Sequence, residues 1–262
     1  MIRLFRVEML KIRTSRASFG ILLTSASLTI LFAVLSATRV GEAGSGVGPL
    51  NTTSGLLRVT TLTGWSMMFA GAFGVMVANG EFRHGTATLT YLAEPNRTRV
   101  LTAKAMAAFC SGSLFGLASA VISTGVGLAF VASKGYPVTL TTTAMIGHGI
   151  GAMLGASLFA VIGVGLGSLI RSQLAGVIGI FVWGLIVEST IGGLFTSVRP
   201  FLPYTAATTL AGIKLGAAAV GPANGSTSGA PLAFVASASL VAFAALVLAA
   251  IANQTTVRRD VS

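Results

Sequence analysis

Charged residues are scarce in this chain. Asp, Glu, Lys and Arg make up 9% of its 262 residues, whereas 53% are hydrophobic. A water-soluble domain of this length could not cover its surface with so few charges. From Ala17 to Thr38 no side chain is charged, and this segment is long enough to cross the roughly 30 Å hydrocarbon core of a bilayer as a helix. The composition therefore indicates an integral membrane protein.

The charge-poor segments also lack the alternation of polar and apolar residues that is typical of strands in a membrane barrel. Lipid offers no water to satisfy peptide groups, so each segment is expected to be a helix. The sequence predicts an all-α, polytopic integral membrane protein with one transmembrane domain over residues 1–262. Its six expected spans cover residues 17–38, 59–80, 105–133, 143–170, 172–195 and 231–253.

Several catalytic and ligand-binding patterns are missing. The single cysteine, Cys110, can form no intramolecular disulfide, and it lies far in sequence from His84 and His148, so no metal site is expected. None of the lysines follows the glycine spacing of a phosphate-binding loop, and no hydrolase motif is present. We therefore expect no catalytic residues, no enzyme activity and no cofactor bound by this chain.

Acidic residues are few: six Asp and Glu stand against 17 Lys and Arg, for a net charge of +11. With a cytoplasmic N-terminus, 12 of the 17 basic residues lie on the cytoplasmic side of the expected spans. The positive-inside rule then predicts that both termini are cytoplasmic and that the number of spans is even. The expected location is the plasma (inner) membrane. Nucleic-acid binding is the disfavoured alternative, because the basic residues follow the topology. The five outer ones are Arg39, Arg58, Lys134, Arg199 and Lys214.

The basic N-terminal segment, residues 1–16, predicts an interfacial amphipathic helix on the inner leaflet. Glu8 and Lys11 point away from its apolar stripe. A disordered basic tail is the alternative. The stripe consists of Ile2, Phe5, Met9 and Ile12.

The cytoplasmic loop between the second and third expected spans is long enough to carry structure of its own. Residues 81–95 predict a short helix, capped by Thr86 after Gly85 and ended by Pro95. A short apolar stripe held between two spans suits docking into a groove on a partner protein. A solvated connector is the alternative. The stripe consists of Phe82, Leu89 and Leu92.

This loop resembles a known family pattern. An acid at the end of the second span, an arginine, a Gly-Thr pair, a short helix and a Pro-x-Arg turn before a lysine are similar to the permease subunit of ABC type-2 transporters (the ABC-2-type exporter family). The basic N-terminus, the six spans and the cytoplasmic termini extend the resemblance over the whole chain. The positions that carry it are Glu81, Arg83, Gly85, Thr86, Pro95, Arg97 and Lys104.

The resemblance implies the membrane-spanning permease subunit of an ATP-driven exporter of a drug, antibiotic, peptide or lipid-like substrate. Its implied partners are a second permease copy or paralogue, membrane lipid and separate ATP-binding cassette ATPase subunits that hold ATP and Mg; no nucleic acid is expected. An ion-gradient-driven secondary transporter and a non-transporting membrane scaffold are the alternatives. The residues implied to couple to the ATPase are Glu81, Phe82, Arg83, Gly85, Thr86, Leu89 and Leu92.

Two titratable residues lie at expected membrane depth. Glu188 belongs to the outer half of the fifth span, where a carboxylate is costly. It is expected either to line a translocation path or gate, or to bond with neighbouring hydroxyls such as those of Ser189 and Thr190. His148, at the outer end of the fourth span, is expected to pack against a neighbouring helix.

The extracellular segment, residues 196–230, is expected to contain a re-entrant or surface helix over 205–220, rather than a seventh crossing, which Lys214 opposes. Small residues at four-residue spacing on the third and fourth spans predict close helix packing. They are Gly112, Gly116, Gly147, Gly151 and Gly155.

Overall fold

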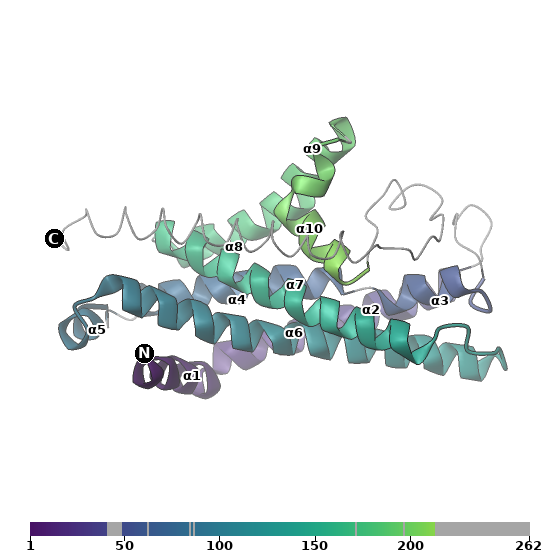
Figure 1. Ribbon diagram of the computed structural model, residues 1–262, viewed down its shortest axis with the longest axis horizontal. Coiled ribbons are helices and arrows are strands. Elements are labelled where there is room, and N and C mark those ends of the chain that lie inside the picture. The colour runs from purple at the N-terminus through teal and green to yellow at the C-terminus, as the bar shows by residue number, and fades with distance from the viewer. Residues whose placement is uncertain are drawn as a thin grey trace.

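A computed structural model describes residues 1–40, 49–61, 63–83, 85, 87–170, 172–195 and 197–212. Within these ranges every regular element is helical, which confirms the all-α class (Figure 1). The elements are α1 (Ile2–Thr14), α2 (Arg16–Arg39), α3 (Thr53–Thr60), α4 (Gly64–Arg83), α5 (Ala87–Ala93), α6 (Arg97–Ser133), α7 (Thr142–Leu169), α8 (Gln173–Val182), a π-helical turn (Trp183–Val187), α9 (Glu188–Leu194), a 3-10 turn (Arg199–Phe201) and α10 (Pro203–Leu210).

Five helical segments in the described part of the chain are long and apolar enough to cross a membrane, which supports a multi-pass protein. The expected sixth span, residues 231–253, lies outside the described residues. The five segments are Arg16–Arg39, Thr53–Glu81, Arg97–Ser133, Thr142–Leu169 and Gln173–Leu194.

Three expected helices have different bounds in the structure. The short helix expected over 81–95 is divided: Glu81 belongs to α4, which ends at Arg83, and α5 covers Ala87–Ala93. The expected span 59–80 falls within the candidate span Thr53–Glu81, in which α3 ends at Thr60 and α4 begins at Gly64. The expected span 105–133 begins earlier, at Arg97, because the Asn96 side chain caps the helix by accepting a hydrogen bond from the Arg99 amide. At 37 residues α6 is about 55 Å long, so its basic first turns extend beyond the hydrocarbon core.

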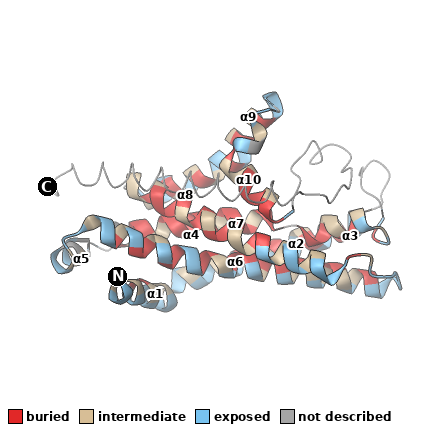
Figure 2. Cartoon of the chain, in the orientation of Figure 1, coloured by how far each residue is buried: buried red, intermediate tan, exposed pale blue. Residues whose placement is uncertain are grey.

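The core of the bundle lies where α4, α6 and α7 meet, and Figure 2 shows buried residues concentrated on α4 and α7. Exposed positions gather on α1, α5 and the end of α9. Large apolar side chains exposed along α2 and α6, such as Leu23 and Val121, suit contact with lipid rather than water. The core is lined mainly by small residues, with a few large ones between them: Met67, Phe73, Phe115, Phe159 and Ile180.

Glycines allow the backbones of these helices to touch. A Cβ added to Gly163 of α7 would collide with the Gly71 carbonyl of α4, and one added to Gly116 of α6 would collide with the Ala152 carbonyl of α7. The predicted close packing is confirmed at Gly116, and Gly163 packs in the same way. For Gly147 the described residues show no such contact, because an added Cβ would meet none of their atoms within 4 Å.

A matched pair of alanine substitutions on α7 tests this packing. Gly163→Ala forces a methyl group against the α4 backbone and should lower the free energy of unfolding by about 1–3 kcal/mol. Gly147→Ala enters open space and should leave stability unchanged or raise it by up to about 1 kcal/mol, because alanine favours the helix. Unfolding of the full chain in detergent measures both. Equal changes in the free energy of unfolding for the two substitutions would contradict the close contact of α7 with α4 at Gly163.

Candidate functional site

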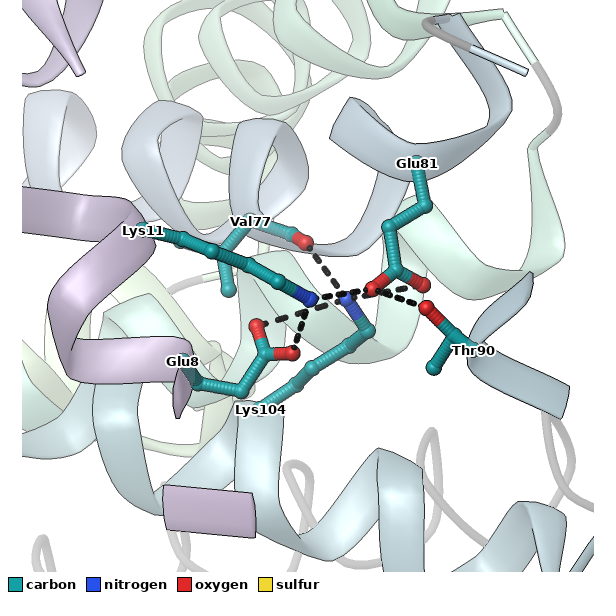
Figure 3. A network of polar contacts seen from close by, with 6 residues as sticks. All are labelled: Glu8, Lys11, Val77, Glu81, Thr90 and Lys104. Carbon is teal, nitrogen blue, oxygen red and sulfur yellow. Dashed lines mark hydrogen bonds and ion pairs between the residues drawn. The ribbon is translucent and has the colours of Figure 1, made fainter. Parts of the chain in front are cut away.

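Glu81 lies in the last turn of α4, is buried and has partners on three sides. Its carboxylate accepts a hydrogen bond from Lys11 Nζ of α1 at 2.6 Å and lies 3.3 Å from Lys104 Nζ of α6. The hydroxyl of Thr90, on α5, donates to the same carboxylate at 3.0 Å. Figure 3 shows these side chains converging from four helices. Glu81 therefore links the short helix α5 to the bundle.

A second acid completes the arrangement. Glu8 of α1 is buried, and its carboxylate oxygens lie 2.8 Å from Lys11 Nζ and 3.5 Å from Lys104 Nζ (Figure 3). Lys104 is only 5% exposed and also donates to the carbonyl of Val77 at 3.3 Å. We call Glu8, Lys11, Glu81 and Lys104 the charge cluster. Two carboxylates and two ammonium groups alternate in it, so its net charge is zero.

Charges can be buried in this way only because each has an oppositely charged neighbour. Removing one ion of a buried set leaves another without compensation, which costs several kcal/mol. Partial burial by itself would lower the pKa of Lys11. The hydrogen bonds from Lys11 to Glu8 and Glu81, together with the negative charges of these two carboxylates, have the larger effect. The pKa of Lys11 is therefore raised above 10.5. The contribution of Lys11 to stability is therefore complete at neutral pH and is lost only as the pH rises through this raised pKa.

The α5 helix presents apolar side chains away from the bundle. Leu89 and Leu92 are 67% and 74% exposed, and Thr88 beside them is exposed too. Gly85, before the helix, has a φ of 67°, which favours glycine and turns the chain between α4 and α5. After the helix, Arg99 of α6 lies 3.8 Å from Glu94. The roles expected for Phe82, Arg83 and Thr86 concern side chains outside the described part of the structure.

The sequence predicts half of the charge cluster. The family resemblance points to Glu81 and Lys104, whereas the helical pattern places Glu8 and Lys11 only on the polar side of an interfacial helix. One signal was available in the sequence: the chain has six acidic residues, and an acid three residues before a lysine in a helix can pair with it. The pairing of α1 with α4 and α6 has no such local signal.

Glu188 occupies a different environment, and its partners among the described residues include no cation. It is 2% exposed, and its carboxylate accepts hydrogen bonds from Trp183 Nε1 (2.7 Å), Tyr204 N (2.8 Å), Thr205 N (2.9 Å) and Thr205 Oγ1 (3.3 Å). The expected bond from Ser189 is not formed, because its hydroxyl donates to the Leu185 and Ile186 carbonyls. Glu188 therefore binds the first turn of α10.

The π-helical turn before Glu188 explains the Trp183 contact. Residues five apart lie on different sides of an α-helix, but the wider π turn brings position i+5 close to position i. The first turn of α10 has no side-chain cap of its own, and Pro203 lacks an amide hydrogen. Glu188 supplies the missing acceptor from a neighbouring helix, at the end of α10 where a negative charge is favoured.

The other end of α10 contacts α7. Nδ1 of His148 donates to the Ala211 carbonyl at 2.8 Å, which agrees with the packing role expected for this histidine. An added Cβ on Gly151 would collide with the Leu210 carbonyl. The described part of the helix expected over 205–220 belongs to α10, which begins at Pro203 and ends at Leu210, and Gly212 follows with a φ of 72°. The remainder of the 196–230 segment, beyond residue 212, lies outside the described residues.

No protein-family model matches this chain, and no curated protein matches it at a significant level. Among the described residues, no group of three His, Cys, Asp or Glu side chains could hold a metal ion. The functional residues are therefore assigned from the geometry of the charge cluster, α5 and the Glu188 site.

Removal of the buried cation tests the charge cluster. Lys104→Met leaves two buried carboxylates with one partner and should lower the free energy of unfolding by about 3–5 kcal/mol. Adding Glu81→Gln should cost less than the sum of the two single changes, because the substitutions remove charges of opposite sign. Unfolding of the full chain in detergent measures both. The control is Lys134→Met, an exposed lysine at the end of the same helix, and additive losses would contradict the pairing.

Loss of one acceptor oxygen tests the Glu188 site. In Glu188→Gln, an amide nitrogen that cannot accept hydrogen bonds faces donors of α10, so stability should fall by about 2–4 kcal/mol. Hydrogen exchange of the Tyr204 and Thr205 amides should become faster. Ser189→Ala, beside it, removes a hydroxyl bonded within its own helix and should leave these amides protected. Unchanged protection in the glutamine variant would show that Glu188 does not hold α10.

Proposed function

We propose that this chain is the membrane-spanning permease subunit of an ATP-driven exporter of the ABC type-2 kind. In this proposal it lies in the plasma (inner) membrane with both termini cytoplasmic, and a separate ATP-binding cassette ATPase docks on α5. The observation that carries the proposal is the position of α5, which exposes Leu89 and Leu92 while Thr90 bonds it to the charge cluster. An exposed apolar helix with a fixed attachment is suited to receive force from a partner.

The attachment of α5 provides a path for that force. Thr90 bonds to Glu81 of α4, and Glu94, just after the helix, pairs with Arg99 of α6. A partner that pushes α5 therefore acts on two long helices at once. Both pack tightly against α7. Rotation of packed helices against one another is an established way to change which side of a membrane a cavity faces.

The energy for transport would come from outside this chain. Its lysines lack the spacing of a phosphate-binding loop, so ATP and Mg are assigned to the ATPase subunits. A second permease copy or paralogue would complete the translocation path. Small and hydroxyl-bearing residues along the helices do not select one substrate, and the proposal covers a drug, antibiotic, peptide or lipid-like molecule.

The Glu188 geometry disfavours the secondary transporter. A carboxylate that carries protons or ions needs lone pairs that can be vacated during each cycle. Glu188 already accepts four hydrogen bonds, two of them from backbone amides of α10. Ion coupling at this residue would have to break the attachment of α10 in every cycle. The same contacts favour a structural role for Glu188 over a direct substrate contact.

The two exposed leucines of α5 provide the test. In Leu89→Ser/Leu92→Ser the apolar contact with a partner is lost, so the full chain should retain an ATPase at least about tenfold less well during purification. Transport-stimulated ATP hydrolysis should fall in parallel. The control is Thr88→Ala, an exposed polar position on the same helix. Mass spectrometry of the purified complex identifies the retained subunit.

Two outcomes would contradict the proposal. One is purification of the wild-type chain from its native membrane, under mild conditions, without any nucleotide-binding subunit. The other is a reporter fused at Thr88 that is exposed on the external side of the membrane, because an ATPase could not reach α5 there.

A further inference from the structure

The α1 helix has two unlike sides. Toward the bundle, Ile12 packs against the core, and the Met9 sulfur accepts a hydrogen bond from Ser111 of α6 at 3.9 Å. The apolar stripe expected to lie on the membrane is therefore partly used for contacts within the protein. Away from the bundle, Ile2 and Leu10 are 72% and 62% exposed.

Three arginines share the outward side with these apolar residues. Arg3, Arg6 and Arg13 are all exposed, and their helical spacing places them on the same side as Leu10. The sequence of α1 contains one acid, Glu8, which is buried and paired with Lys11 and Lys104. The charge cluster thus removes the helix's negative charge from the surface. What remains outside is cationic and apolar.

The connection to α2 places this side at the level of the lipid head groups. A single residue, Ser15, separates the end of α1 at Thr14 from the start of α2 at Arg16. The exposed side chains of Phe19 and Leu23, in the first two turns of α2, belong to a segment apolar enough to span the membrane. A helix attached to a span by one residue cannot move far from the boundary between head groups and acyl chains. In Figure 1, α1 lies at the lower edge of the bundle, beside the start of α2.

We propose that the outward side of α1 is a binding surface for the head groups of anionic phospholipids. The guanidinium groups of Arg3, Arg6 and Arg13 donate paired hydrogen bonds to phosphate oxygens. Ile2 and Leu10 enter the boundary with the acyl chains. An acidic protein surface would match the charge but not the exposed apolar residues at head-group depth, so lipid is the occupant. This surface does not depend on the proposed transport function.

Lipid binding to the full chain tests the proposal. The chain, purified in a neutral detergent, is titrated with phosphatidylglycerol or phosphatidylcholine, and bound lipid is counted by native mass spectrometry. Wild type should prefer phosphatidylglycerol, and Arg3→Gln/Arg6→Gln/Arg13→Gln should weaken its binding by about tenfold or more. The matched control, Arg39→Gln/Lys134→Gln/Arg199→Gln, neutralises the same number of charges elsewhere and should retain most of the preference.

The lipid titration distinguishes lipid from other molecules that could bind the outward side of α1. Equal affinity of wild type for the two lipids, or an equal loss in both triple variants, would overturn the proposal. Unchanged phosphatidylglycerol binding together with loss of a co-purifying protein would also overturn it, because the surface would then bind protein. The single variant Arg6→Gln, with an expected loss of about fivefold, provides the same test if the triple variant does not fold. Loss of lipid preference with an intact ATPase complex would support it.

Discussion

Three buried charges and one partly exposed lysine determine how α1, α4 and α6 meet at one end of the bundle. Glu8, Glu81 and Lys104 are buried, and Lys11 reaches in from the surface to pair with both carboxylates, so that each buried charge is compensated by another charge. This requirement fixes the N-terminal helix against two long helices that are far away in sequence. It also fixes where the polypeptide can leave α4 to form α5, since Thr90 shares the Glu81 carboxylate.

The packing of α4 and α6 against α7 supports the proposed transmission of force from α5. Glycines at Gly71 and Gly163 bring the α4 and α7 backbones into contact, and Gly116 does the same between α6 and α7. Close backbone contact leaves few side chains between the helices to rearrange, so a displacement at one end is carried along the bundle rather than absorbed. The charge cluster lies at one end of the same two helices, α4 and α6. The contacts of α5 with Glu81 and Arg99 therefore connect it to two helices that both pack closely on α7.

Much of this fold could be predicted from the sequence, because charge-free length decides which segments suit lipid. The segments that the structure places in α2 and α7 follow from such runs alone. Helix ends were less predictable: α6 begins at Arg97 because of the local Asn96 cap, although its first turns are basic. The pairing of Glu8 and Lys11 with Glu81 could not be predicted, because it depends on how α1 folds back on the bundle. The same limit applies to Glu188, whose partners on α10 are 16 and 17 residues away.

Glu81 and Glu188 solve one structural problem by two different means. Each is a buried carboxylate on a long helix that holds a short helix, α5 or α10. At Glu81 the charge is compensated by lysines, whose flexible stems and compact ammonium groups allow the contact to persist through small displacements. At Glu188 the partners in the structure are directional N–H and O–H donors, which weaken steeply as their angles change. The lysine contacts of Glu81 therefore tolerate small displacements of α1 and α6, and α5 is held to this carboxylate by one hydroxyl, that of Thr90. The several directional contacts at Glu188 favour one position of α10. A single side-chain contact with Glu81 leaves α5 freer to move, as the proposed docking of a partner requires, whereas the contacts of α10 with Glu188 and with His148 make it a fixed brace between the fourth and fifth expected spans.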